Sequence, residues 1–165
     1  MNSIRPATEH DFPSIWTIFQ DIIKAGDTYV NDATSTEHEA HQMWLGPSVR
    51  TFVACADTQV VGAYKLVPNT PGRGAHVANG SYIVAAQYRG RGIGRRLVEH
   101  SLQEAKKAGY KAIQFNFVVN TNRTAIKLFE AYGFQTLATI PKAFYHDTLG
   151  YIDAYLMHRS LEDET

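Results

Sequence analysis

The sequence has little of what marks several large classes of protein. It contains one cysteine, Cys55, so an internal disulfide framework is excluded. Sixteen Lys and Arg residues balance sixteen Asp and Glu residues, which leaves no basic field able to attract nucleic acid or an anionic membrane surface. No stretch approaches the roughly 20 apolar residues of a membrane-spanning helix, and the N-terminus lacks the apolar core of a signal peptide. We therefore expect a cytoplasmic protein without nucleic-acid or membrane partners.

The chain also lacks internal repeats, low-complexity tracts and linkers. Its length of 165 residues is that of one ordinary domain, which buries enough surface to fold without disulfides. The composition, with 44% hydrophobic and 19% charged residues, is that of a globular protein rather than a disordered one. We predict a single domain over residues 1–165.

The order of the periodic segments predicts an α/β (α+β) fold. Thr8 and Asp11 have capping-box spacing and precede a helix that ends at Gly26, and Thr34 and Glu37 repeat that spacing before a shorter helix. The expected strands are 3–5, 51–56, 60–67, 75–85, 111–119, 134–140 and 152–159, and the expected later helices are 93–108 and 122–132. The strands from 51 to 85 form an antiparallel meander, and the strand–helix–strand order that follows implies a parallel pair.

The most informative segment is a glycine-rich turn between the last strand of the meander and the next helix. Gly90, Gly92 and Gly94 occupy alternate positions, so backbone N–H groups can approach a ligand closely. These groups lie at a helix N-terminus, where unpaired donors and the helix dipole favour an anion. Local positive charge comes from four arginines, Arg89, Arg91, Arg95 and Arg96. The turn therefore predicts a phosphate or pyrophosphate ligand.

Two common phosphate-binding patterns do not fit this turn. A P-loop needs G-x-x-x-x-G-K-[S/T], which the sequence lacks. A dinucleotide-binding fingerprint needs G-x-G-x-x-G, which fails at the third glycine from either Gly90 or Gly92, and the next strand ends without an acidic residue. An NAD-binding domain is therefore disfavoured. A purely structural turn is the remaining alternative, and the surrounding arginines argue against it.

Two motifs at these positions resemble those of the GCN5-related N-acetyltransferase (GNAT) superfamily. Its acetyl-CoA signature, [Q/R]-x-x-G-x-[G/A] between a strand and a helix, is matched by residues 89–94 and, in an overlapping register, by residues 87–92. Its downstream motif, N-x-x-A-x-x-x-[Y/F]-x-x-x-G-F, is matched by residues 122–134. The resemblance covers nearly the whole chain. It implies a mixed central sheet with helices on both faces and a splay between the fourth and fifth strands.

The resemblance also implies acetyl-CoA as the cosubstrate, with direct attack of an amine on its thioester. The diphosphate is expected on the amides of residues 91–94, the pantetheine arm beside Ile83 and Val84, and the oxyanion on a backbone amide near Val84. The residues expected to bind the cofactor are Ile83, Val84, Arg89, Gly90, Arg91, Gly92, Ile93, Gly94, Arg95, Asn122 and Phe129. No metal is expected, because no Cys/His spacing suggests a metal site.

Proton transfer is where the sequence departs from the superfamily. Many members have a tyrosine at the position of Phe129, and its hydroxyl protonates the leaving thiolate, which phenylalanine cannot do. Tyr132 is interpreted as a packing residue, so a water, another side chain or no acid at all stay open. The base is also open: Asp27 and Glu37 lie in the segment expected to flank the acceptor, while His76 and His146 are more simply surface or packing residues. The candidate catalytic side chains are Asn122 and Asp27. These gaps keep a catalytically silent acyl-CoA-binding module as the alternative to an enzyme.

The acceptor site is predicted from asparagines. Asn79 lies on the strand leading to the glycine turn, and Asn116 lies on the next parallel strand. Amides within strands cost free energy unless they are paired, so these two either bond the splayed backbone or face the acceptor. With Asn122 they resemble asparagines of fungal proline-analogue acetyltransferases, which hold an amino-acid-like substrate there. The resemblance implies acetyl transfer to the primary amine of a small, amino-acid-like molecule, and it allows a homodimer.

Two loops are expected beside the acceptor. The segment Asp27-Thr28-Tyr29 resembles the acceptor-side loop of related small-molecule acetyltransferases, with Tyr29 as the substrate-binding candidate and a plain turn as the alternative. Tyr145-His146-Asp147 is expected in a polar loop near the last strands, where it would wall the same pocket. Cys55, in mid-strand, is interpreted as a small buried hydrophobe.

Overall fold

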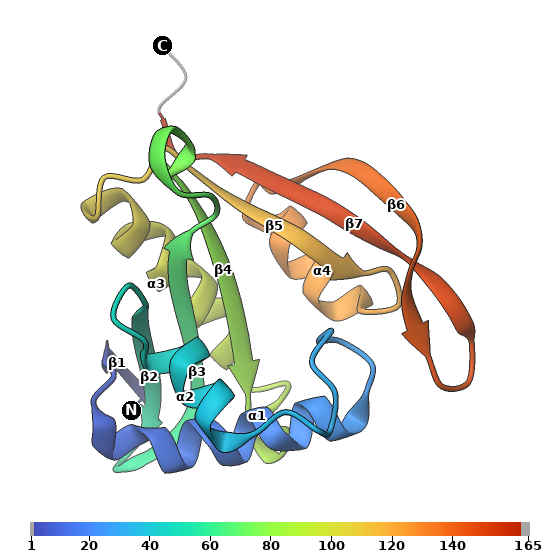
Figure 1. The fold of residues 1–165 in the computed structure, drawn as a ribbon. Coiled ribbons are helices and arrows are strands. Elements are labelled where there is room, and N and C mark those ends of the chain that lie inside the picture. Colours follow the sequence, from blue (N-terminus) through green and yellow to red (C-terminus); the bar gives the residue numbers. More distant parts are fainter. Residues whose placement is uncertain (1, 163–165) are drawn as a thin grey trace.

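A seven-stranded mixed sheet forms the centre of residues 2–162, the part of the chain that the computed structural model describes (Figure 1). The strand order is β1-β2-β3-β4-β5-β7-β6, with β4 and β5 parallel and the other neighbours antiparallel. The strands are β1 Asn2–Pro6, β2 Arg50–Ala56, β3 Gln59–Pro68, β4 Val77–Val84, β5 Ala112–Val119, β6 Gln135–His146 and β7 Gly150–Ser160. The helices are α1 Phe12–Ala25, α2 Glu37–Leu45, α3 Ile93–Lys107 and α4 Arg123–Ala131, with short 3-10 turns η1 Glu9–Asp11, η2 Gly72–Gly74 and η3 Ala86–Tyr88. The predicted mixed α/β fold is confirmed.

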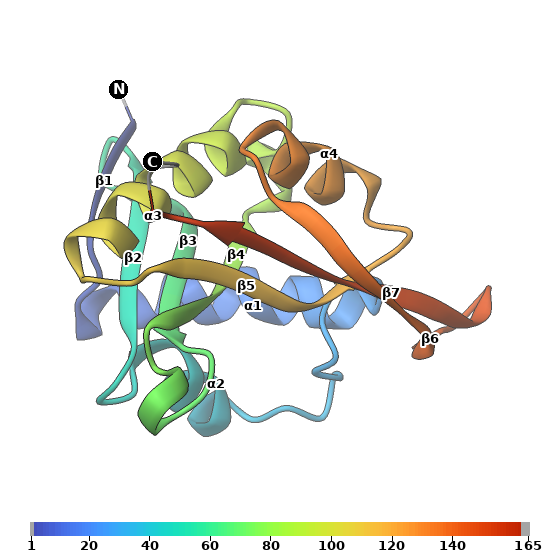
Figure 2. The ribbon, with the colours of Figure 1, turned by 90° about the horizontal axis from the view of Figure 1, so that it is seen from above.

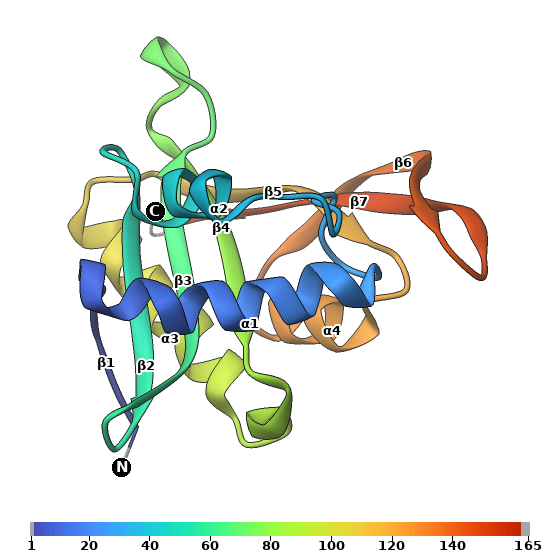
Figure 3. The ribbon, with the colours of Figure 1, turned by 60° about the horizontal axis from the view of Figure 1, so that its bottom comes forward.

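Helices cover both faces of the sheet, as predicted. α1 and α2 lie on one face and α3 and α4 on the other (Figure 2 and Figure 3). Each long helix turns an apolar stripe to the sheet: Ile15, Phe19 and Ile22 on α1, and Ile93 and Leu97 on α3, are all buried. The sheet therefore separates two cores. No helix within residues 2–162 is long and apolar enough to cross a membrane.

The predicted splay between β4 and β5 is present and begins near the N-terminal ends of both strands. Their parallel ladder holds two pairs, which join residues 77–78 to residues 112–113. Beyond these pairs the two strands diverge (Figure 1), although β4 stays paired with β3 as far as Val84. On the other side β5 stays paired with β7 as far as Val119. Each strand is thus supported from outside while the edges that face each other separate.

The predicted start of the second helix is two residues too early. Thr36, rather than Thr34, caps α2: its hydroxyl accepts a hydrogen bond from the Glu39 N–H at 3.2 Å, and the Glu39 carboxylate accepts one from the Thr36 N–H at 2.7 Å. Thr34 instead closes a turn on Asp32, whose carboxylate accepts bonds from the Thr34 N–H and hydroxyl. Two threonine–glutamate pairs overlap here with the same spacing, so spacing does not choose between them.

The last two strands form a longer hairpin than predicted. β6 runs to His146 instead of ending at Ile140, so Tyr145 and His146, predicted in a loop, lie in the strand. Lys142 has a left-handed φ of 51°, and the register with β7 shifts just after Ile140. Proline has no N–H to donate and is typical of a strand end, so Pro141 favours the shorter strand. In the structure the backbone forms a bulge at Pro141 and Lys142 and then resumes pairing with β7.

A buried carboxylate ties β1 to the start of α1. Asp11 is 6% exposed and accepts two hydrogen bonds from the Arg5 guanidinium, both at 2.8 Å. It also accepts bonds from the Thr8 N–H at 2.7 Å and the Thr8 hydroxyl at 3.0 Å, which confirms the predicted capping interaction. Chiefly because of the bonds from Arg5, the pKa of Asp11 is lowered to about 2.

We expect Asp11→Asn to lower the free energy of unfolding at pH 7 by about 1–2 kcal/mol, a value reduced because Arg5 is half exposed and screened by solvent. A carboxyl whose pKa is lowered by folding stabilises the protein above its unfolded pKa, and this stabilisation is lost as the pH falls through the folded pKa. Urea denaturation of parent and variant should therefore show a difference that shrinks from about pH 4 toward pH 2. Asp21→Asn, on the exposed side of α1, is the matched control and should show little difference at any pH. A difference that stays constant over this range would contradict the assignment.

Candidate active site

The glycine turn joins the end of β4 to α3. Gly90 and Gly92 have left-handed φ angles of 74° and 78°, and Gly92 is the N-cap of α3. A β-carbon at either position would meet no atom within 4 Å, so backbone conformation rather than crowding requires glycine, and the outer side of the turn is open. The first turn of α3 carries no acidic residue. The turn that leads into the N-terminal amides of α3 is therefore open on its outer side, as an anion site there requires.

Positive charge surrounds this open surface. The Arg91 guanidinium lies 5.1 Å from the centroid of the Tyr88 ring, and the Tyr88 hydroxyl donates to Gln59 Oε1 at 3.1 Å, which together hold Arg91 beside the turn. Ile93 is buried and fixes the first turn of α3 on the sheet. The fold thus gathers the predicted residues of this segment, Arg89, Gly90, Arg91, Gly92, Ile93, Gly94 and Arg95. Amide donors, a helix N-terminus and guanidinium groups are the set that fits a diphosphate.

The edge of β4 that faces the splay carries backbone groups for an extended ligand. Hydrogen bonds from the Asn69 N–H to the Val77 carbonyl and from the Ala85 N–H to the Val61 carbonyl lie at opposite ends of the antiparallel β3–β4 ladder. Residues of such a ladder alternately face their partner and turn away from it. The residues of β4 beyond the parallel pairs that turn their N–H and C=O groups toward the splay are Gly80, Tyr82 and Val84.

Val84 and Ile83, both predicted to contact the cofactor, differ in orientation. Val84 turns its backbone toward the splay, so its N–H lies on the edge that an oxyanion or a pantetheine amide would meet. Ile83 turns its backbone toward β3, and its side chain, 1% exposed, packs in the core beneath α1. We therefore interpret Ile83 as a residue that holds the strand in place.

Tyr29 brings the loop after α1 against β4. Its hydroxyl donates a hydrogen bond to the Tyr82 carbonyl, one of the groups that face the splay, at 3.2 Å. Its ring packs edge-on against Phe19 with the centroids 5.2 Å apart. Burial raises the pKa of this hydroxyl, so it remains a donor at neutral pH. Tyr29 thus lies beside the strand that is expected to hold the thioester.

The asparagines take part in a chain of amide hydrogen bonds across the splay. Asn79 Nδ2 donates to the Gln114 carbonyl at 3.1 Å, just beyond the last β4–β5 pair. Gln114 Nε2 donates to Asn116 Oδ1 at 3.0 Å, and Asn116 Nδ2 donates to Asn69 Oδ1 at 2.7 Å. Of the two alternatives that the sequence left open for Asn79, this bond is the one to the backbone of the splayed strands. This bond uses the side-chain nitrogen of Asn79, so its side-chain oxygen is the atom that could accept a hydrogen bond from the substrate amine.

Three polar residues of this region were missed from the sequence. Asn69 lies in the loop after β3, and Ser81 and Gln114 lie on the two diverging strands. Ser81 is two residues from Asn79, and Gln114 is two residues from Asn116, so strand alternation places each on the same face as the predicted asparagine. That spacing was available in the sequence as a signal.

Phe129 lies inside an aromatic cluster. It is 8% exposed, and its ring centroid lies 4.3 Å from that of Phe115 and 5.8 Å from that of Tyr82. Phe134 stacks on Phe115 at 4.5 Å. Tyr132, half-buried, packs against the hydrophobic core that contains these rings, which supports its interpretation as a packing residue. The ring of Phe129 therefore helps to pack α4 against β4 and β5.

The two candidate catalytic side chains have different surroundings. Asn122 caps α4, with its Oδ1 accepting a hydrogen bond from the Ala125 N–H at 3.4 Å. Asp27 is exposed directly after Gly26, and a β-carbon at Gly26 would lie 3.7 Å from Asp147 Oδ2 in the β6–β7 turn. Asp27 therefore lies where the loop after α1 meets the last hairpin. Asn122 therefore has a structural role as the cap of α4, and Asp27 remains a candidate residue on the acceptor side.

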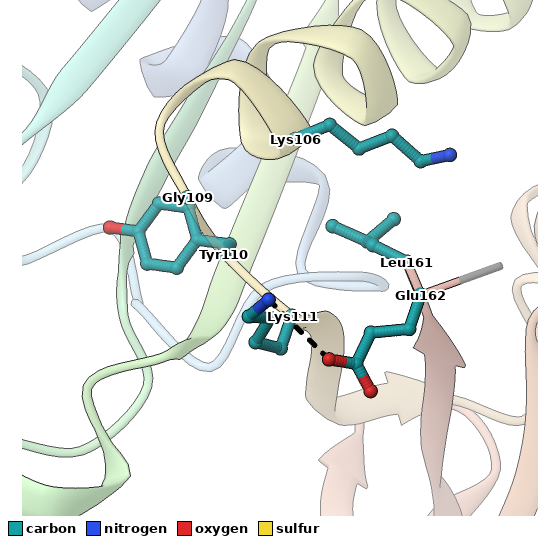
Figure 4. Close-up of a pocket in the computed structure, with 6 residues that line it drawn as sticks. All are labelled: Lys106, Gly109, Tyr110, Lys111, Leu161 and Glu162. Atoms are coloured by element: carbon teal, nitrogen blue, oxygen red, sulfur yellow. Dashed lines mark ion pairs between the residues drawn. The ribbon is translucent and has the colours of Figure 1, made fainter.

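A hollow of about 380 Å³ lies away from these residues, at the C-terminal end of α3 (Figure 4). Its lining is Lys106, Gly109, Tyr110, Lys111, Leu161 and Glu162. Lys111 and Glu162 form an ion pair across it at 3.4 Å. Since α3 has 15 residues, this hollow is about 22 Å from the glycine turn and forms a separate feature. No cluster of three or more metal-ligating side chains occurs in the described part of the chain.

Residues 13–134 match the family model described as the acetyltransferase (GNAT) family, so this chain belongs to that family and is an N-acetyltransferase. The N-acetyltransferase aca1 of Schizosaccharomyces pombe is 32% identical over a match 163 residues long, gaps included, and the match covers 86% of this chain and 77% of aca1. The L-amino acid N-acetyltransferase AaaT of Escherichia coli is 27% identical over 162 residues, covering 94% of this chain and 96% of AaaT. The fungal relative supports the resemblance noted in the sequence.

Solved structures agree with the family assignment. A GCN5-related N-acetyltransferase from Kribbella flavida superposes with a TM-score of 0.92 at 44% identity, over 96% of this chain and 97% of the other. A phosphinothricin acetyltransferase from Sinorhizobium meliloti, in complex with AcCoA, superposes with a TM-score of 0.88 at 19% identity, over 99% of this chain and 90% of the other. At that identity the second likeness shows the fold alone.

For the donor site we expect Gly92→Asp to weaken CoA binding at least about tenfold from a dissociation constant of roughly micromolar order, because a carboxylate would oppose the diphosphate. Isothermal titration calorimetry with CoA measures this change. Gly109→Asp is the matched control, since Gly109 has a left-handed φ of 87° and equally open surroundings but follows the far end of α3. It should keep the parental CoA affinity. Unchanged affinity in a folded Gly92→Asp protein would remove the glycine turn from the donor site.

For proton transfer we expect Tyr132→Phe to keep kcat within about threefold of the parent, because the ring is used for packing. Phe129→Tyr should remain folded and active, with a small loss of stability if the new hydroxyl finds no partner in the aromatic cluster. Steady-state rates and thermal melting separate the two effects. A hundredfold fall in kcat for a folded Tyr132→Phe protein would identify Tyr132 as the missing acid.

Proposed function

We propose that this N-acetyltransferase moves acetyl from acetyl-CoA to the primary amine of a small, amino-acid-like molecule. The observation that carries the proposal is the arrangement along β4. The strand runs into the glycine turn at its C-terminal end, and the group Asn79, Ser81 and Tyr29 lies along it on the side covered by α1 and α2. The name of AaaT, an L-amino acid N-acetyltransferase of nearly the same length, supports the acceptor class.

The geometry suits direct attack on the thioester. A pantetheine arm that extends from the glycine turn along β4 would meet the outward-facing backbone groups of Val84 and Tyr82 in turn. One of those N–H groups would then stabilise the oxyanion of the tetrahedral intermediate. Tyr29 holds the Tyr82 carbonyl, so it fixes this part of the edge from the acceptor side. The amine would approach from that side.

The acceptor amine needs a base. The α-amino group at a peptide terminus has a pKa of about 8, but the carboxylate of a free amino acid stabilises the ammonium form, so its amine is mostly protonated at neutral pH and must lose a proton before it attacks. We propose Asp27, which is exposed near the β6–β7 turn, as the group that accepts this proton. A CoA thiolate is a tolerable leaving group, so Phe129 at the usual tyrosine position does not prevent turnover.

The alternative of a catalytically silent acyl-CoA-binding module is separated by one measurement. Release of the CoA thiol is followed with acetyl-CoA and a panel of amino acids, polyamines, antibiotics and peptides. The proposal expects turnover with amino acids of the panel. Tight CoA binding without thiol release from any of these amines would favour the silent module.

We expect Asn116→Ala to lower kcat/KM for the acceptor by about tenfold, the effect of one lost polar contact, without changing CoA affinity. Asn116 bonds the side chains of Gln114 and Asn69, so its replacement leaves the strand backbones unchanged, whereas Asn79 bonds the Gln114 carbonyl and its replacement changes the splay. Asn79→Ala should therefore lower kcat/KM more. Gln103→Ala, exposed on α3, is the control and should behave as the parent. Parallel loss of CoA binding in both asparagine variants would make them structural supports.

A further inference from the structure

Lys65 is a buried lysine on the acceptor side of the sheet. It lies in β3 and is 7% exposed, a burial that lysine adopts rarely. Ala63, two residues earlier, packs in the core formed with α1 and α2, so strand alternation places Lys65 on that face as well. Its ammonium lies 6.0 Å from the centroid of the Trp44 ring on α2. α1 and α2 cross this face together (Figure 3).

The Lys65 ammonium has no anion beside it. Within residues 2–162 it forms no hydrogen bond or ion pair, and its contact with Trp44 is the polar interaction that the structure shows. Burial lowers the pKa of Lys65, and no neighbouring charge contributes to that change. Beside it, the indole N–H of Trp44 is a fully buried donor without an acceptor in the described chain, whereas the Lys65 ammonium is not fully enclosed. Donors and positive charge are therefore in excess here, and buried charges in proteins are normally paired.

The neighbours of Lys65 are the residues proposed for the acceptor. In the sheet register Lys65 lies opposite Ser81 of β4, with Asn79 as the diagonal neighbour on the same face. The hydroxyl of Tyr29 meets β4 one residue beyond Ser81. On its other side Lys65 lies opposite Thr51, whose hydroxyl is engaged with the Trp44 carbonyl. This group contains amides and hydroxyls but no carboxylate.

We propose that Lys65 binds the carboxylate of the acceptor and so selects amino acids over amines that lack an acid group. The inference rests on the proposed function and adds the residue that recognises the acid. A substrate carboxylate supplies the anion that the chain does not, and a nearby anion favours the charged form of Lys65. The resulting hydrogen bond is charge-assisted. A carboxamide in the same place would leave the ammonium unpaired, which is the basis of discrimination.

The test compares acids with amides. Each L-amino acid that the parent enzyme acetylates in the panel is paired with its carboxamide, and kcat and KM are measured for both. We expect the parent to prefer the acid by about tenfold or more in kcat/KM. Lys65→Met, which replaces a cation by an apolar chain of similar length, should lose about tenfold or more with the acid, mainly through KM, and less than about threefold with the amide. Lys107→Met, exposed on α3, is the control and should keep the preference.

Stability and CoA affinity separate recognition from a structural role. Because Lys65→Met removes an unpaired charge from a largely buried side chain, its melting temperature should not fall below that of the parent, and its CoA affinity should be unchanged. Lys65→Arg retains the charge but not the shape, and should recover part of the preference for the acid.

The outcomes distinguish the two proposals. Turnover restricted to amines without a carboxylate would overturn both the amino-acid acceptor and the role of Lys65. Acetylation of amino acids with an acid-over-amide preference that survives Lys65→Met would overturn the role of Lys65 and leave the proposed function standing. Equal losses with acid and amide, together with a shifted acidic limb of the pH profile of kcat, would assign Lys65 to proton transfer and overturn carboxylate binding.

Discussion

The short parallel pairing of β4 with β5 is the constraint on which the site depends. Two residue pairs hold the strands together, and the Asn79 amide then bonds the Gln114 carbonyl where a third pair would follow. Had the ladder continued, the backbone groups of Tyr82 and Val84 would have been used within the sheet. Because they are not, one edge of a well-supported strand remains for a ligand that can pair as an extended chain. The glycine turn and α3 follow the C-terminal end of this strand, and Tyr29 bonds the Tyr82 carbonyl on this edge.

The local structure of the glycine turn, the proposed diphosphate site, could be predicted because its residues are consecutive in the sequence. A strand, a glycine turn and a helix start follow one another, and the left-handed angles of Gly90 and Gly92 explain why those positions are glycine. The element order also predicted the mixed sheet and its parallel pair. The errors were local. Two overlapping threonine–glutamate pairs led to a cap at Thr34 instead of Thr36, and the sequence around Lys142 predicted a strand end where the structure has a bulge.

The proposed acceptor site was harder to predict, because its residues come from separate strands and depend on register. Gln114 and Ser81 become relevant when the alternation of β4 and β5 is known, and Lys65 requires in addition the position of α2. A lysine within an apolar strand is easily assigned to solvent from sequence, since most lysines are exposed. Phe129 illustrates the opposite case: the motif located it, but its role in packing follows from the three rings around it.

The separation of the two halves has a consequence for how such a domain can diversify. The proposed diphosphate site lies in one contiguous stretch of the chain, whereas the proposed acceptor surroundings come from the loop after α1, the middle of the sheet and the β6–β7 turn, where Asp147 approaches Gly26. Insertions and exchanges in the two loops leave the contiguous stretch untouched. Grafting those loops, together with a change at a single buried position of β3, is therefore a compact route to redirecting the enzyme toward other amines without rebuilding its use of the acyl donor.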